Sequence, residues 1–223
     1  MSTFEAIFFD FDGVLVDSEP VHHQCWCVVM GRLGVELDWP TYQSTLRGHS
    51  GKPLLEALCR LKDPPLAFEQ VQSYYDFKND LFRDTVLRNP GQLMSADVRL
   101  LLDDLSQYRL AVVSSARRTH VVPILESLGL LDRFETLVCR EDVQTLKPSP
   151  EPYRTAAMRL GVERALVVED SEAGAASGRG AGFEVIMHPD YTHLPWLVRE
   201  RLANSLVQRE KISSTGGASS VPR

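Results

Sequence analysis

The chain has 223 residues, of which 43% are hydrophobic and 24% charged, and its formal net charge is −6. These values describe a soluble globular protein with ample length to bury a core. An acidic balance disfavours a basic nucleic-acid groove, and no apolar run is long enough to span a bilayer. The first residues also lack the basic start of a signal peptide. We therefore expect a cytoplasmic monomer with neither a nucleic-acid nor a membrane partner.

The cysteines give no sign of a metal or redox centre. There are four of them, at Cys25, Cys27, Cys59 and Cys139, and their spacing matches neither a zinc site nor a redox dithiol. In a cytoplasmic protein such residues are reduced and mostly buried. We expect four free thiols with no role in the chemistry.

The first half of the chain predicts one strand followed only by helices. An apolar, aromatic-rich run at 6–9 ends in polar residues and a glycine, which indicates a short buried strand leading into a turn. Helical patterning then covers residues 21–33, 39–46, 53–61 and 66–82, with turn residues between these segments. Four helices inserted directly after one strand indicate a separate helical cap.

The second half alternates between the two kinds of element. Helices are predicted at 96–105, 119–128, 151–160, 172–181 and 194–207, and strands at 109–114, 136–139, 165–169 and 184–187. This alternation predicts an α/β fold with a parallel sheet covered on both faces. The predicted domains are a core of residues 1–16 and 88–212, a cap of residues 17–87, and a flexible tail of residues 213–223.

Acidic residues follow the first strand at Asp10 and Asp12. In an open α/β sheet, ligands bind beyond the carboxyl ends of the strands, so both lie where chemistry is expected. Two carboxylates this close repel each other, and a hard divalent cation such as Mg²⁺ relieves that cost. One can act as a nucleophile while the other transfers protons. An isolated Asp-x-Asp more often caps the next helix, so the pair alone does not decide its role.

Three later strand ends or loops offer complementary groups. Ser114 closes a predicted strand, where its hydroxyl and the following N–H groups could hold a phosphate oxygen. Lys147 lies in a proline-rich loop before a helix, where an ammonium could balance a phosphate. Glu169 and Asp170 again bring carboxylates to a strand end. Taken singly, these are an ordinary turn residue, a surface lysine and helix caps.

Taken together they form a recognisable set. The stretch from Asp10 to Glu19 resembles the first signature of the haloacid dehalogenase superfamily, in its phosphatase form. The other three signatures are matched in type and order by Ser114, by Lys147 with its Lys-Pro-x-Pro pattern, and by Glu169-Asp170 with Gly174. The resemblance covers nearly the whole chain and implies a Rossmann-like core with an inserted all-helical cap.

The resemblance also implies roles for these residues. Asp10 would attack phosphorus and become an aspartyl phosphate, while Asp12 would protonate the leaving oxygen and later deprotonate the attacking water. Ser114 and Lys147 would hold the phosphoryl oxygens, and the Lys147–Pro148 bond is expected to be cis. The implied Mg²⁺ ligands are Asp10, Asp12 through its backbone carbonyl, Asp170, and Glu169 directly or through water. The second aspartate argues against the dehalogenase and phosphonate-cleaving branches.

The cap residues resemble the β-phosphoglucomutase-like subfamily and its small-sugar-phosphate phosphatases. The implied substrate-binding residues are His22, Trp26, Arg47, Gly48, Lys78 and Asn79 of the cap, with Ser115 of the core. Gly51 stands where the mutase has an arginine that grips a remote phosphate. We therefore expect a Mg²⁺-dependent phosphatase of small phosphorylated sugars, with a phosphosugar mutase as the alternative and an inactive phosphate-binding module as the least favoured reading.

Overall fold

The protein is described by a computed structural model over residues 4–47, 49, 51–188 and 190–215, with side chains to residue 205. The chain divides into two compact units, described separately below. One comprises the described parts of Met1–Val16 and Met94–Arg223, and the other is Asp17–Leu93. The predicted cap, 17–87, lies inside the second unit, and its role as a cap stays a prediction.

The first unit is built on a parallel sheet. Its strands are β1 (Ala6–Phe9), β2 (Arg109–Val113), β3 (Thr136–Val138), β4 (Ala165–Glu169) and β5 (Glu184–Met187), in the spatial order β3-β2-β1-β4-β5. All neighbouring pairs run parallel. Every residue of β1 and β4 is buried, as expected for central strands covered on both faces. The predicted α/β fold with a Rossmann-like sheet is confirmed.

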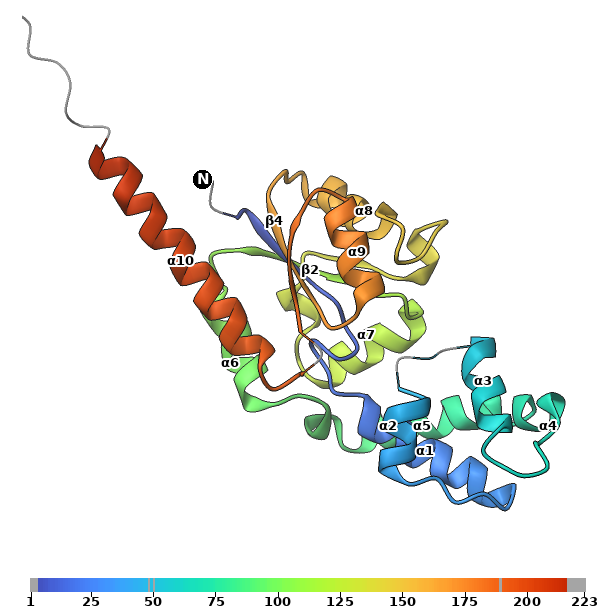
Figure 1. Ribbon diagram of the computed structural model, residues 1–223. Coiled ribbons are helices and arrows are strands. Elements are labelled where there is room, and N and C mark those ends of the chain that lie inside the picture. Colours follow the sequence, from blue (N-terminus) through green and yellow to red (C-terminus); the bar gives the residue numbers. More distant parts are fainter. Residues whose placement is uncertain (1–3, 48, 50, 189, 216–223) are drawn as a thin grey trace, which may run out of the picture. The chain divides into compact units, whose positions relative to one another are not determined.

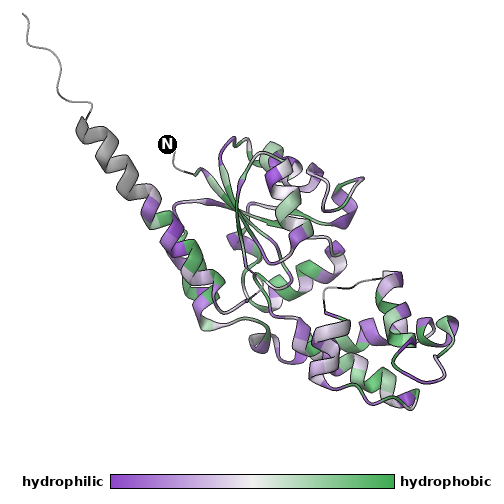
Figure 2. Cartoon of the chain, viewed as in Figure 1, coloured by the Kyte–Doolittle hydropathy of each residue, from purple (hydrophilic) through white to green (hydrophobic). Residues whose placement is uncertain are grey.

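Helices cover both faces of this sheet (Figure 1). They are α6 (Ala96–Asp104), α7 (Arg118–Ser127), α8 (Glu151–Leu160), α9 (Glu172–Gly180) and α10 (Leu194–Thr215), with short 3-10 turns at Leu131–Arg133 and Arg140–Asp142. Helices α8 and α9 lie on one face, and α6 and α10 lie on the other. Figure 2 shows that the strands of this sheet are largely green, hydrophobic residues, whereas the helices around them carry more purple, hydrophilic residues. The core between sheet and α8 includes Phe8, Val113, Val167, Tyr153 and Ala156.

The second unit is helical throughout its described residues. Its elements are α1 (Glu19–Arg32), α2 (Trp39–Thr45), α3 (Gly51–Cys59), α4 (Phe68–Gln72), α5 (Tyr75–Arg88) and a 3-10 turn at Pro90–Leu93. Pro20 in the first turn of α1 and Asp38 as the N-cap of α2 fix two of the helix starts. Its own core includes Trp26, Met30 and Leu58, so the unit buries apolar surface within itself.

Two predicted elements differ from the structure. The single helix predicted at 66–82 is two helices, α4 and α5, because the Ser73 hydroxyl donates to Gln70 O and the chain turns through Tyr74 (φ −92°, ψ 0°). Helix α5 then continues to Arg88. At the other end, α10 includes residues 213–215 of the predicted tail, and residues 216–223 lie outside the described residues.

The remaining expectations concern cysteines and membranes. All four cysteines are free, and three of them are buried while Cys27 is half-buried. Within the part of the chain that the structure describes, no helix has both the length and the hydropathy needed to cross a bilayer.

Candidate active site

The candidate site lies where the order of the strands reverses. Strand β1 pairs with β2 on one side and with β4 on the other: β2 and β3 are added in one direction from β1, and β4 and β5 in the opposite direction. Asp10 follows β1 directly, and its backbone N–H donates to Val168 O of β4 across 3.0 Å. Glu169 is the last residue of β4 and Asp170 follows it. Ligands of open α/β sheets bind at such a point, beyond the carboxyl ends of the strands.

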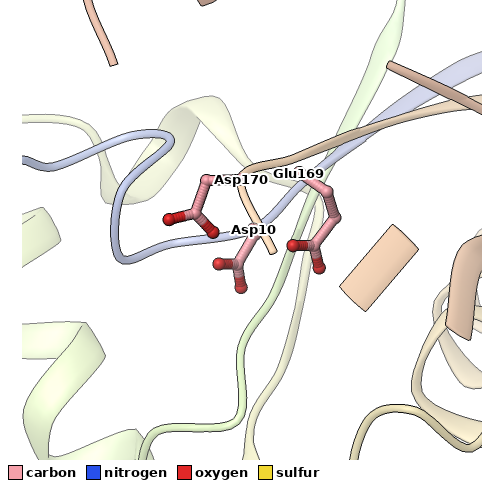
Figure 3. Close-up of side chains that lie close together, drawn as sticks. All are labelled: Asp10, Glu169 and Asp170. Carbon is pink, nitrogen blue, oxygen red and sulfur yellow. The ribbon is translucent and has the colours of Figure 1, made fainter. Parts of the chain in front are cut away.

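Three carboxylates meet at this edge. One oxygen from each of Asp10, Glu169 and Asp170 lies within 4.8 Å of the others. Figure 3 shows the three side chains converging from the ends of two adjacent strands. The Asp10 side chain is 13% exposed and that of Glu169 is fully buried. So much negative charge in a buried place is unfavourable unless cations or protons offset it.

Lys147 supplies one positive charge to the cluster. Its Nζ donates to Asp10 Oδ1 and to Glu169 Oε1, each across 2.6 Å, and to Val113 O across 2.8 Å. The side chain is only 6% exposed. The Lys147–Pro148 peptide bond is cis, as the resemblance implied. Lys147 therefore joins β1, β2 and β4 at one point.

Both oxygens of the Glu169 carboxylate accept hydrogen bonds. Besides Lys147, Oε1 accepts a hydrogen bond from the Tyr153 hydroxyl at 2.7 Å, and Oε2 accepts one from the Ser171 hydroxyl at 3.1 Å. Ser171 is also the N-cap of α9, where its oxygen accepts from Gly174 N. Glu169 is thereby tied to the start of the next helix.

Two glycines make room for these acids. A Cβ on Gly13 would lie 2.1 Å from Asp170 Oδ2, and one on Gly174 would lie 1.8 Å from Glu169 Oε1. Gly13 also has a φ of +77°, which other residues rarely adopt. At both positions any side chain would push a carboxylate out of the cluster.

The raised pKa values of Asp10 and Asp170 indicate that Lys147 does not fully balance the negative charge of the cluster. Burial raises the pKa of Asp10 well above its usual value, against the opposing charge of Lys147. Burial, followed by the charge of Glu169, raises the pKa of Asp170 to about 7. Burial alone lowers the pKa of Lys147, but the charges of Asp10 and Glu169 outweigh it and leave that pKa raised. The cluster can take up more positive charge than one lysine provides.

A family model described as haloacid dehalogenase-like hydrolase matches residues 4–182, a span that runs from β1 to the end of α9. The chain belongs to the haloacid dehalogenase-like hydrolase family. The match includes all four signature positions that the sequence predicted. The predicted family is therefore confirmed.

Several proteins similar to this hydrolase are named as phosphatases. It is 32% identical over 184 residues to the validoxylamine A 7'-phosphate phosphatase of Streptomyces hygroscopicus subsp. limoneus, covering 80% of this chain and 83% of the relative. It is 29% identical over 188 residues to the phosphorylated carbohydrates phosphatase of Thermotoga maritima, and this match covers 82% of this chain and 83% of the relative. The predicted enzyme class, a phosphoric monoester hydrolase, is confirmed.

The fold of the hydrolase is also that of a solved structure. The crystal structure of β-phosphoglucomutase from Clostridium difficile matches with a TM-score of 0.68, covering 92% of this chain and 99% of that one. Sequence identity is 19%, so this likeness concerns the fold. It agrees with the predicted core and inserted helical region.

The remaining core residues of the hydrolase signatures lie around the cluster. Ser114 follows β2 directly after Val113, whose carbonyl Lys147 contacts, and its buried Oγ accepts from Ala116 N at 3.0 Å. Ser115 is exposed. Asp12 is near enough to raise the pKa of Asp170, although its carboxylate is not one of the three that converge.

Within the helical unit of the hydrolase, three predicted substrate-binding residues come together. Lys78 Nζ lies 2.7 Å from His22 Nδ1 and 5.6 Å from the centre of the Trp26 ring. His22 stacks on Phe82 with 4.0 Å between ring centres, a partner that the sequence did not indicate. Trp26 is 1% exposed and belongs to the core of the unit. Lys78 is an uncommon buried lysine, since it is only 5% exposed.

The other predicted residues of this unit are less constrained. Arg47 and Asn79 are exposed. Burial raises the pKa of Asp17 and the charge of Arg47 partly offsets this effect, so the two charges are near each other. Gly48 lies outside the described residues. The substrate-binding roles of all these residues stay predictions.

The cluster fits a hard divalent cation. Three carboxylates within reach of one point are the oxygen-rich donors that Mg²⁺ prefers, and the raised pKa values of Asp10 and Asp170 show where further positive charge would be favourable. Glu169 fits least well as a direct ligand, because Oε1 already accepts two hydrogen bonds and Oε2 one. Asp10 and Asp170 are the better candidates.

Proposed function

We propose that this hydrolase is a Mg²⁺-dependent phosphatase that hydrolyses small phosphorylated carbohydrates through an aspartyl-phosphate intermediate. One observation supports it above the others. A buried ammonium, Lys147 Nζ, lies 2.6 Å from the carboxylate of Asp10, the residue to which the motif resemblance gives the role of nucleophile. Catalysis of phosphoryl transfer depends mainly on positioning the nucleophile and on stabilising the negative charge of the phosphoryl group.

In the first half-reaction, an oxygen of Asp10 attacks phosphorus. The bond from phosphorus to the ester oxygen breaks, and Asp12 gives that oxygen its proton, so the carbohydrate leaves as an alcohol. In the second half-reaction, Asp12 takes a proton from water, whose oxygen attacks phosphorus. The bond between Asp10 and phosphorus breaks, inorganic phosphate leaves, and both carboxyl groups return to their starting states.

Two further residues would hold the phosphoryl group during both steps. Lys147 Nζ contacts Asp10 Oδ1, so its ammonium can reach an oxygen of a phosphoryl group bonded to Asp10. Ser114, at the end of the neighbouring strand β2, has a hydroxyl that accepts from Ala116 N and keeps its own proton to donate. Both stabilise negative charge that spreads over the phosphoryl oxygens.

The carboxylates of Asp10 and Asp170, with the backbone carbonyl of Asp12, would hold the Mg²⁺ ion. When bound, the cation supplies positive charge that offsets the carboxylates and the phosphoryl group. Glu169 would assist through Lys147, or through the remaining capacity of Oε2. The three hydrogen bonds that Glu169 already accepts favour the indirect route.

The substrate class rests on the relatives and on the helical unit. One relative is named for a 7'-phosphate and another for phosphorylated carbohydrates, at 32% and 29% identity. In the helical unit, His22 and Lys78 place polar groups among the rings of Trp26 and Phe82. Both rings are 1% exposed, so what this set offers a carbohydrate is the imidazole of the half-buried His22, a hydrogen-bonding group whose orientation Phe82 and Lys78 fix.

The test is a panel of phosphorylated metabolites, assayed for phosphate release with Mg²⁺ present. The proposal expects the highest kcat/KM among sugar phosphates, and no release above background by the Asp10→Asn variant. Equal rates on nucleotides and amino-acid phosphates would overturn the substrate class. Release by Asp10→Asn at the wild-type rate would overturn the mechanism.

A further inference from the structure

We propose that Tyr153 is a positioning residue for this reaction, acting through Glu169 on Lys147. The inference rests on the proposed function, because it concerns how the phosphoryl-binding lysine is held. Tyr153 lies in the first turn of α8, outside the four signature positions, and nothing in the sequence pattern assigns it a role.

The hydroxyl of Tyr153 contacts the cluster from inside the core. The side chain is fully buried, and its hydroxyl donates to Glu169 Oε1 across 2.7 Å. Its ring stacks on Phe8 of β1, with ring centres 6.4 Å apart and planes at 17°. The ring is therefore fixed by packing against the strand that carries Asp10, and the hydroxyl has a set direction.

Lys147 contacts the same tyrosine and the same carboxylate oxygen. Its Nζ donates to Glu169 Oε1 at 2.6 Å and lies 5.2 Å from the centre of the Tyr153 ring. Tyr153 and Lys147 thus bind one oxygen, while Ser171 binds the other. These contacts fix the rotation of the carboxylate, so that Oε1 is turned toward the ammonium that also bonds Asp10.

Removing the hydroxyl alone should loosen this arrangement. Without the Tyr153 hydroxyl, Glu169 Oε1 keeps Lys147 as its donor and Oε2 keeps Ser171, so the carboxylate can shift together with the ammonium away from the phosphoryl position. Groups that orient a catalytic or ligating residue typically contribute 10–100-fold to activity or affinity. We expect Tyr153→Phe to lower kcat/KM by about 10–100-fold and to weaken the binding of inorganic phosphate by about 10-fold.

A matched control is available in Tyr191. Its hydroxyl donates to Leu15 O at 3.2 Å and accepts from Ser95 N at 3.0 Å, and the side chain is 8% exposed. Tyr191→Phe therefore also removes a buried tyrosine hydroxyl from this unit, but one that bonds backbone groups. Both variants should unfold at a lower temperature than wild type, and Tyr191→Phe should keep its kcat/KM and its phosphate affinity.

The experiment measures both quantities well below the unfolding temperature, with Mg²⁺ saturating. Calorimetric titration with inorganic phosphate gives a dissociation constant that does not depend on turnover, and a loss of stability alone does not change it. A cycle with Glu169→Gln tests the route: Tyr153→Phe should have little further effect in that background, because the oxygen it orients has been altered.

The outcomes separate the two proposals. Loss of phosphate affinity in Tyr153→Phe, absent in Tyr191→Phe and absent again in the Glu169→Gln background, supports the positioning role. Wild-type affinity and kcat/KM in Tyr153→Phe, or equal losses in the two tyrosine variants, would overturn it. A wild-type protein that hydrolyses no phosphate ester would instead overturn the proposed function, and the phosphate titration would still decide the role of Tyr153.

Discussion

Lys147 Nζ donates to Asp10 Oδ1 across 2.6 Å, although 137 residues separate the two in the sequence. Both side chains are largely buried, at 6% and 13% exposure. A buried ion pair of this kind costs desolvation energy, so it is weak evidence for stability and better evidence for a functional site. It holds the proposed nucleophile beside the proposed phosphoryl-binding group, and groups positioned in this way reduce the reorganisation that catalysis requires.

Gly174 should tolerate no side chain. The Cβ of Gly174→Ala would lie 1.8 Å from Glu169 Oε1, so the carboxylate must move and Lys147 loses its anchor. We expect the free energy of unfolding to fall by about 1–3 kcal/mol, as in other overpacked sites. We also expect kcat/KM to fall by at least about 10-fold. Chemical denaturation and steady-state kinetics measure the two effects.

Gly180→Ala is the control in the same helix. Its Cβ would meet only the ring of Pro150, with Cβ at 3.5 Å and Cγ at 3.9 Å, which are ordinary contacts. Both stability and kcat/KM should therefore stay near wild type, or stability should rise slightly. If the two substitutions had equal effects on activity, the close packing of Gly174 on Glu169 would not matter to the reaction.

Removing divalent metal should abolish turnover. A chelator should reduce phosphate release to background, and Mg²⁺ should restore it. The reason is that the single positive charge of Lys147 does not balance the three carboxylates of the cluster. Ca²⁺ should substitute poorly, since its larger and looser coordination shell disturbs the alignment of Asp10. Full activity after exhaustive dialysis against chelator would contradict the assignment of Asp170 as a ligand.

The stability of the metal-free protein should depend on pH near neutrality. Burial raises the pKa of Asp170 to about 7, from 3.8 in the unfolded chain, so the folded state binds that proton more tightly. The contribution of this group to stability is therefore fully present below the unfolded pKa and is lost as pH rises from about 4 to about 7. Between pH 5 and 8 the unfolding temperature should drop by a few degrees, which corresponds to about 1 kcal/mol or more.

Asp170→Asn should flatten this pH dependence, because no proton is gained or lost at that position. Added Mg²⁺ should raise the wild-type unfolding temperature more at pH 8 than at pH 5, since protons compete with the cation at low pH. A metal-free wild type that becomes more stable from pH 5 to pH 8 would contradict the charge balance described for the cluster.

The hydrolase should release phosphate and should not interconvert sugar phosphates. A mutase must grip the remote phosphate of its bisphosphate intermediate, which an arginine does well. The corresponding residue here is Gly51, at the start of α3, with a φ of +59°. With β-glucose 1-phosphate and a trace of glucose 1,6-bisphosphate, free phosphate should form. Accumulation of glucose 6-phosphate with little free phosphate would show mutase activity instead.

Much of the core could be predicted from sequence because its signals are local. Strands β1 and β4 are continuous apolar runs, and parallel pairing places their ends at one edge whatever the helices between them do. Asp10 and Glu169 were therefore predictable as neighbours. The contact of Lys147 with both depended on the family resemblance, because nothing in its loop alone specifies a direction.

Other features depend on tertiary packing and gave no local signal. The break at Ser73 divides a segment whose apolar spacing is consistent with one helix. Tyr153 lies in an ordinary first helical turn after Pro148, Pro150 and Pro152, and only its complete burial shows that its hydroxyl needs a partner. Phe82 reads as a core residue until it is found stacked on His22.

The central claim is that Asp10 is phosphorylated during turnover. Rapid acid quenching after mixing enzyme, Mg²⁺ and a ³²P-labelled sugar phosphate tests it most directly. We predict that the protein becomes labelled and that hydroxylamine removes the label, as it does from an acyl phosphate. Mass spectrometry should assign the label to Asp10. A folded Asp10→Asn variant should carry no label, and its turnover should be at least about 10³-fold lower. Rapid turnover without labelled protein, together with wild-type activity in Asp10→Asn, would contradict it.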